Sequence, residues 1–133
     1  MTNLLKSVVF VVLILSSTTG SAQRPSLQKD VFNHYWCVES ESPQYQLHFL
    51  GKDTCEIVSP KGLTLWRKEK MTGDVTIEYD ACVMDEGKSG DRLSDLNCFW
   101  MASDPKASTI FKRMKERKGN FLQTYSLRLY YMG

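Results

Sequence analysis

From residue 35 onward the chain consists of short runs in which apolar and polar residues alternate, separated by turns rich in Gly, Pro and Asp. This pattern is typical of β-strands, because successive side chains of a strand point to opposite faces. The predicted strands are residues 35–39, 45–50, 54–58, 63–67, 75–84, 96–102 and 126–132. One helix is predicted within 105–118, since Asp104 and Pro105 suit a helix start and Gly119 suits the position after its end. The sequence therefore predicts an all-β sandwich with one short helix.

The run at 96–102 shows best how one strand can serve both a core and a binding surface. Its alternation puts Cys98 and Trp100 on one face and Asn97 and Phe99 on the other. We expect the face of Trp100 to enter the core. The face of Phe99 is then left open to a ligand.

The last run, 126–132, has the pattern of a central strand. Arg128 and Tyr130 share one face, and Leu127, Leu129 and Tyr131 share the other. No partner strand follows in this sequence, and an uncovered strand edge favours association. We therefore expect either that a second copy completes the sheet or that the chain is shorter than its natural domain, with self-association as the result.

Residues 1–22 have the features of a secretory signal peptide. Lys6 precedes an apolar run at 8–15, and the small residues that end the segment suit a cleavage site. The run is much shorter than the ~20 residues that a membrane-spanning helix needs. We expect cleavage after this segment, a secreted or periplasmic location, one domain over 23–133 and no membrane association of the cleaved protein.

The overall charge is close to balanced, with 17 Lys and Arg against 15 Asp and Glu. This balance gives no electrostatic reason to expect a nucleic-acid partner, and we predict none. A local basic cluster at 112–118 is best explained as a solvated helix face.

An acidic loop lies between the two longest strand patterns. Asp85, Glu86, Asp91 and Asp95 carry the oxygen ligands that Ca²⁺ prefers, but their spacing differs from that of an EF-hand loop. Arg92 stands among them, so a local ion pair that shapes the loop is the favoured interpretation. We expect no cofactor, with a structural calcium ion as the alternative.

The four cysteines allow three disulfide connectivities, and their spacing contains no zinc-binding C-x-x-C pair. Cys82 and Cys98 lie on runs that we expect to be neighbouring antiparallel strands. A Cys82–Cys98 disulfide is therefore one prediction, and a free, buried Cys98 thiol is the equally supported alternative.

Several segments together resemble a known family. They are residues 62–66, 75–80, 91–105 and 127–133. The chain resembles a family of secreted bacterial domains of unknown function that have a concanavalin A-like jelly-roll fold and occur in polysaccharide-degrading bacteria. The resemblance implies a polysaccharide partner. It also implies that the domain at 23–133 lacks its C-terminal strands, because the similar proteins continue beyond the segment that ends at 133.

The residues can be assigned to such a function because aromatic rings stack on sugars and polar groups bind hydroxyls or carboxylates. Trp66 is assigned equally to the core or to a groove. The predicted substrate contacts are Trp66, Phe99, Arg92, Glu78 and Asp80.

Cleavage of a uronate polymer by elimination is the favoured reaction. Tyr130 could act as the base, and Arg128 with Asn97 could neutralise the uronate carboxylate as charge develops. Glu78 and Asp80 could instead form the carboxylate pair of a glycoside hydrolase, but Val83 stands where concanavalin-like hydrolases have a further Glu. The remaining alternatives are a non-catalytic glycan-binding module, a structural or interaction protein, and an inactive fragment.

Overall fold

The computed structural model describes residues 7–17, 28–84, 87 and 96–133. The strands are β1 (Ser7–Ser17), β2 (Trp36–Ser40), β3 (Gln46–Leu50), β4 (Thr54–Ser59), β5 (Leu63–Arg67), β6 (Val75–Met84), β7 (Cys98–Ser103) and β8 (Arg128–Met132). The helices are α1 (Lys29–Tyr35) and α2 (Met114–Arg117), with two 3-10 helices, η1 (Ile110–Arg113) and η2 (Phe121–Ser126).

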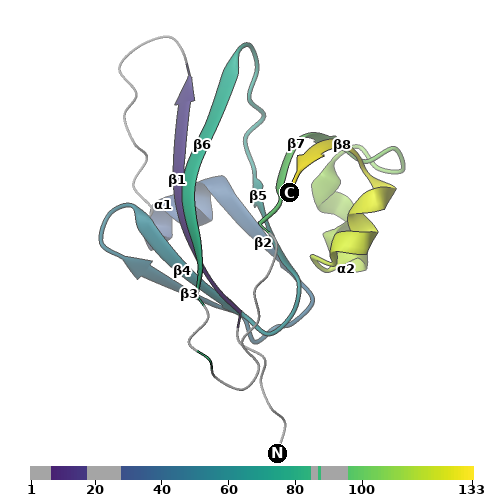
Figure 1. Ribbon diagram of the computed structural model, residues 1–133. Coiled ribbons are helices and arrows are strands. Elements are labelled where there is room, and N and C mark those ends of the chain that lie inside the picture. The colour runs from purple at the N-terminus through teal and green to yellow at the C-terminus, as the bar shows by residue number, and fades with distance from the viewer. Residues whose placement is uncertain (1–6, 18–27, 85–86, 88–95) are drawn as a thin grey trace, which may run out of the picture.

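The described strands form antiparallel sheets (Figure 1). One sheet has the strand order β3-β4-β1-β6, and two smaller sheets consist of β2-β5 and β7-β8. Each strand predicted from residue 35 onward is present, with its ends within two residues of the prediction. The prediction of a protein built mainly from β-strands is therefore confirmed.

Strand β1 lies where the sequence predicted the apolar part of a signal peptide. Its backbone pairs with β4 on one side and along its whole length with β6 on the other, from Val8 opposite Met84 to Ser17 opposite Val75. A continuous apolar run is equally suited to a strand with neighbours on both edges. Periodicity alone could not have separated the two interpretations.

The predicted neighbourhood of β6 and β7 is wrong. Strand β6 pairs with β1, and β7 pairs with β8, so the two strands lie in different sheets. Cys82 and Cys98 are both free thiols in the structure, as are Cys37 and Cys55. The Cys82–Cys98 disulfide is therefore not formed in it. Cys98 is a free thiol, as in the alternative prediction, but it is half-buried where that prediction placed it in the core.

The predicted helix is present but begins later than expected. Asp104 does not start it, because residues 105–109 form turns and η1 begins only at Ile110. The Asp104 carboxylate instead accepts a hydrogen bond from the backbone N–H of Lys106 at 2.8 Å, which stabilises a turn. The end is close to the predicted one: α2 ends at Arg117, Lys118 takes the left-handed cap position with a φ of 55°, and Gly119 follows with a φ of 69°. Helices α1 and η2 were not predicted.

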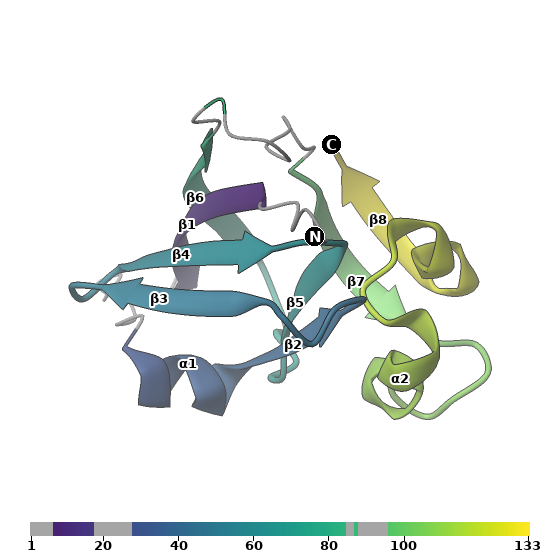
Figure 2. The same cartoon turned by 90° about the horizontal axis from the view of Figure 1, so that it is seen from below.

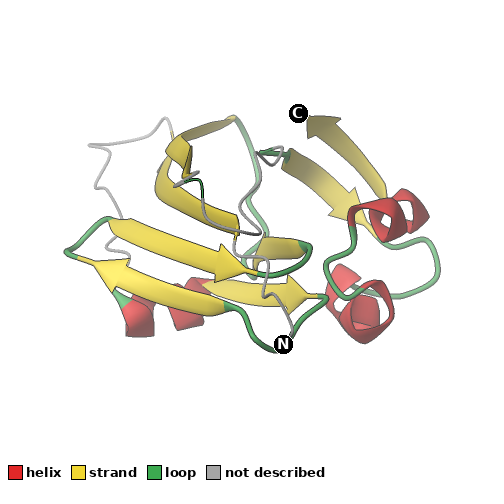
Figure 3. Ribbon diagram, turned by 60° about the horizontal axis from the view of Figure 1, so that its bottom comes forward, coloured by secondary structure: helices red, strands yellow, loops and turns green. Residues whose placement is uncertain are grey.

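The core lies between α1 and the larger sheet. Its buried residues are Phe32 of α1 and Cys55 and Ile57 of β4. The Phe32 ring packs edge-on against Phe49 of β3, with 5.3 Å between centroids. Figure 2 shows α1 alongside β2 and β3, and Figure 3 shows the C-terminal helical turns gathered beside the β7-β8 sheet.

Cys55 is expected to resist alkylation in the folded protein. Burial, with a smaller contribution from Glu56, raises the pKa of its thiol from 9.0 to about 11. Because the thiolate is the reactive species, iodoacetamide at about pH 8.5 should label the exposed Cys82 and leave Cys55 unlabelled until the protein is denatured. For the same reason the stability contributed by the neutral Cys55 thiol should decrease as the pH rises from 9 toward 11. Mass spectrometry of the labelled peptides is the measurement, and equal labelling of both cysteines would contradict the burial of Cys55.

Candidate functional site

The outer face of the two-stranded β7-β8 sheet presents a pair of aromatic rings to solvent. Trp100 of β7 lies opposite Tyr130 of β8, and their rings stack with centroids 5.9 Å apart and planes 16° apart. Trp100 is 38% exposed and Tyr130 is 60% exposed. Arg128 is also exposed and lies two residues before Tyr130, on the same face of β8. We call Trp100, Tyr130 and Arg128 the aromatic platform.

The faces of β7 are the reverse of those predicted. Phe99, expected on an open face, stacks on the buried Trp66 and on Phe121, with centroids 5.9 Å and 6.2 Å away. Trp100, expected in the core, is on the open face. Alternation determines which residues share a face, but what packs against each face decides which one is buried. Here η2 supplies Phe121, and η2 was missing from the prediction.

The remaining predicted site residues do not join the platform. Trp66 is buried, with its ring stacked on Phe99, which agrees with its predicted packing role and places it away from the open face. Asn97 is half-buried beside Gly133. Glu78 and Asp80 are exposed on β6, in another sheet. Of the predicted catalytic set, the structure brings only Arg128 and Tyr130 onto one face.

Part of the prediction falls outside the described residues. Arg92, predicted to contact substrate, lies there, as do the acidic residues 85, 86, 91 and 95 that raised the question of calcium. Within the described part of the chain, no group of three or more His, Cys, Asp or Glu side chains is placed to hold a metal ion.

Strand β7 contains a bulge directly after Trp100. Trp100 pairs with Tyr130, and the next pair is Ser103 with Arg128. Between these two pairs β7 therefore contains one residue more than β8. Met101 takes up the extra residue with a left-handed φ of 53°. This conformation is disfavoured for residues other than Gly by about 1–2 kcal/mol. Bulges of this kind bend a strand and change the direction of its side chains.

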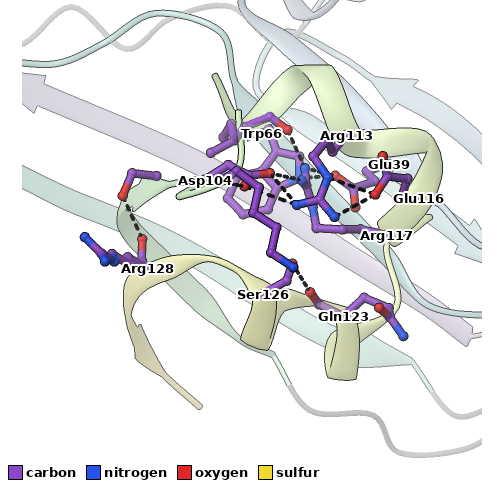
Figure 4. A network of polar contacts seen from close by, with 12 residues as sticks. Glu39, Trp66, Asp104, Arg113, Glu116, Arg117, Gln123, Ser126 and Arg128 are labelled. Carbon is purple, nitrogen blue, oxygen red and sulfur yellow. Dashed lines mark hydrogen bonds and ion pairs between the residues drawn. The ribbon is translucent and has the colours of Figure 1, made fainter. Parts of the chain in front are cut away.

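Next to the β7-β8 sheet lies a buried group of charged side chains (Figure 4). Glu39 of β2 and Arg117 of α2 are 3% and 2% exposed. The Nη2 of Arg117 donates to Oε2 of Glu39 at 2.9 Å and to the backbone oxygen of Ile110 at 2.6 Å. Glu39 also accepts from Nε1 of Trp66 at 2.8 Å and from the backbone N–H of Gly119 at 3.0 Å. Three donors from the described part of the chain thus bind the Glu39 carboxylate.

A second carboxylate completes this group. Asp104, whose side chain is fully buried, lies 3.5 Å from Nη1 of Arg117 and accepts from Nη1 of Arg113 at 3.3 Å. Arg113 in turn donates from Nε to Glu116 at 2.8 Å, and this hydrogen bond holds the pKa of Glu116 below its usual value. We call Glu39, Asp104, Arg113 and Arg117 the buried charge network. Because both of its carboxylates are paired with arginine and covered, the network ties elements together and is poorly suited to acid–base catalysis.

A neighbouring carboxylate holds the turn that ends α2. Glu41 accepts from Nδ2 of Asn120 at 2.6 Å and from the backbone N–H of Gly62 at 3.0 Å. Together with the bond from Gly119 to Glu39, these contacts attach the turn at 119–120 to the end of β2. The basic cluster at 112–118 is therefore not simply a solvated helix face, since Arg117 within it is buried.

Strands paired in antiparallel sheets, a helical C-terminal region and an exposed Trp–Tyr pair define a β-rich domain with an open aromatic surface. Residues 57–133 match the family described as "Domain of unknown function (DUF6250)", and the chain belongs to this family. The expectation of a domain-of-unknown-function family is confirmed. The searches of curated proteins and of solved structures both found no match. None of the helices in the described residues is long and apolar enough to cross a lipid bilayer.

Proposed function

We propose that this protein is a secreted carbohydrate-active domain that binds a polysaccharide through the aromatic platform. The observation that carries the proposal is the stacked, solvent-exposed pair of Trp100 and Tyr130 with Arg128 on the same face. Large aromatic side chains are usually covered, and grouped ones that remain exposed often mark a binding surface. Sugar rings present apolar C–H faces that can lie against such rings.

Arg128 favours an acidic polysaccharide over a neutral one. A guanidinium group is planar, stays charged and matches the two oxygens of a carboxylate. A uronate residue whose ring lies against Trp100 or Tyr130 could place its carboxylate next to Arg128. The proposed ligand class is therefore a polyuronate.

Binding has more support than catalysis. Elimination needs a base, a group that neutralises the uronate carboxylate, and their joint placement around one sugar. Tyr130 and Arg128 share a face, but Asn97 lies beside Gly133. Lyase activity is therefore the second candidate function, and hydrolysis by Glu78 and Asp80 has less support because these residues lie in another sheet.

Secretion and the jelly-roll fold are part of the proposal: the jelly-roll fold is proposed from the family resemblance, and secretion from the composition of the N-terminal segment. The apolar run that forms β1 has the composition of a signal peptide, with Lys6 before it. Cleavage after residue 22 would remove β1 and free the edges of β4 and β6 that it pairs with. The N-terminal sequence of the protein recovered from the culture medium tests this step, and an intact residue 1 would contradict it.

Trp100→Ala is expected to weaken binding to a polyuronate by at least about tenfold, because the largest contact surface of the platform is lost. Affinity electrophoresis in gels that contain polygalacturonate, alginate or a neutral glucan is the measurement. The matched control is Tyr125→Ala, which removes a 74% exposed aromatic side chain of η2 outside the platform. Equal migration of the Trp100 and Tyr125 variants would contradict the proposal.

The same assay distinguishes the ligand class and the reaction. Arg128→Met should weaken retention by the two polyuronates and leave retention by a neutral glucan unchanged. New ultraviolet absorbance from unsaturated sugar ends, lost in Tyr130→Phe, would establish the lyase candidate. Retention without such absorbance would establish a binding module.

A further inference from the structure

In and directly after strand β7, the directions of two side chains, those of Trp100 and Asp104, are incompatible with regular alternation. Trp100 points to solvent, whereas Asp104, directly after the strand, is buried in the charge network. Residues four apart on a regular strand share a face. Without an irregularity, a buried Asp104 would require Trp100 to point inward, and an exposed Trp100 would require Asp104 to point outward.

The bulge at Met101 resolves this conflict. It adds one residue between the Trp100–Tyr130 pair and the Ser103–Arg128 pair. After the bulge the alternation is shifted by one, so Ser103 takes the outer position opposite Arg128 and Asp104 the inner one. The same shift explains why Phe99 and Asp104, five residues apart, both lie on the buried side.

The backbone of Met101 indicates that the surroundings impose this shift. Its φ of 53° is left-handed, yet the residue has a Cβ, and its side chain is 77% exposed and gains little from packing. A disfavoured conformation persists where neighbouring contacts determine it, and such positions are common at functional sites. Here the neighbouring contacts are the Trp100–Tyr130 stack on one side and the Asp104 ion pairs on the other.

We propose that Met101 is a positioning residue for glycan binding: its bulge turns Trp100 toward the ligand while Asp104 remains in the buried charge network. The inference rests on the proposed function, because it assigns a role to Met101 only through Trp100. Met101 itself contributes backbone conformation, so its side chain is expected to be replaceable by others that tolerate the left-handed region.

The test compares four changes at one position. Met101→Gly and Met101→Leu keep the extra residue, and neither is branched at Cβ. Met101→Val introduces a β-branched side chain, for which a left-handed φ is much less accessible. Deletion of Met101 removes the extra residue. Each protein is assayed for polyuronate binding and by ¹⁵N NMR of the Trp100 indole N–H, which is assigned by its absence in Trp100→Phe. The exposure of the indole is measured from broadening by a soluble gadolinium chelate.

The glycine and leucine variants are expected to bind within about threefold of wild type and to keep the wild-type indole resonance and exposure. The deletion is expected to weaken binding by at least about tenfold, with a displaced and less exposed Trp100 indole. If the deletion does not fold, the valine variant decides, with binding at least about threefold weaker and a displaced resonance as the expected result.

Wild-type binding together with a wild-type indole resonance in the deciding variant would overturn the inference and leave the proposed function intact. If wild-type protein binds no polyuronate, the proposed function fails, and with it the role of Met101 in glycan binding. The indole resonance and exposure would then still decide whether Met101 sets the direction of Trp100.

Discussion

Arg117→Met is expected to lower the free energy of unfolding by about 3–5 kcal/mol, which is typical of removing one partner from a buried ion pair. Methionine fills a similar volume, so the loss is mainly electrostatic. Of their partners among the described residues, Glu39 would lose its only charged donor, and Asp104 would lose one of its two arginines. Equilibrium unfolding in urea, followed by tryptophan fluorescence, measures the change.

Two further variants test whether the loss of stability comes from the buried charge network or from the removal of any positive charge. Arg128→Met removes an exposed arginine and should change the unfolding free energy by no more than about 0.5 kcal/mol. Adding Glu39→Gln to Arg117→Met should cost less than the sum of the two single changes, because the buried carboxylate no longer needs a cation. A loss for Arg117→Met as small as that for Arg128→Met would show that the network does not stabilise the fold.

Gly119→Ala is expected to destabilise the protein by about 2–5 kcal/mol, from the left-handed backbone and from steric overlap together. Gly119 has a φ of 69°, and a Cβ there would overlap the backbone carbonyl group of Glu39. The clash cannot be relieved by a side-chain rotation because the obstructing atoms are backbone. Movement of the turn away from β2 would break the hydrogen bond from Gly119 to Glu39.

Gly51→Ala is the matched control for the backbone term alone. Gly51 has a φ of 71°, but a Cβ there would meet nothing within 4 Å. Its cost should be about 1–2 kcal/mol. Thermal unfolding of both variants gives the comparison, and equal losses would mean that the close approach of Gly119 to β2 adds nothing.

The strands could be read from the sequence because alternation is a local property. Residues 63–67 and 75–84 were predicted at their observed bounds, since the turns on either side end each run clearly. The neighbours of each strand could not be read in this way. The partner of β7 is β8, about 30 residues further along the chain, and the covering residue Phe121 lies in a 3-10 helix with no clear periodicity.

Two of the three residues of the aromatic platform were predicted to share a face, because alternation along one strand is local. Arg128 and Tyr130 share a face because they are two residues apart on one strand, and this was correct. The orientation of Trp100 was wrong because it depends on the packing of the opposite face and on a bulge that nothing in the sequence marks: a bulge with a left-handed residue usually carries Gly, and here it carries Met101. The buried charge network was missed because Glu39 and Arg117 are 78 residues apart, and charged residues are ordinarily expected at the surface.

Glu39 lies outside the segment that matches the family, but its contacts belong to the folded structure of that segment. The family match begins at residue 57, inside β4, and leaves out all of β2. A polypeptide limited to the matched residues would contain Arg117, Gly119 and Asn120 without Glu39 and Glu41, the carboxylates that hold them. Among the residues that the structure describes, Arg117 would keep Asp104 as its one acidic partner, and the indole N–H of Trp66 would lose its acceptor Glu39. The smallest segment that keeps these groups paired must therefore begin before β2, well upstream of the boundary drawn by family similarity.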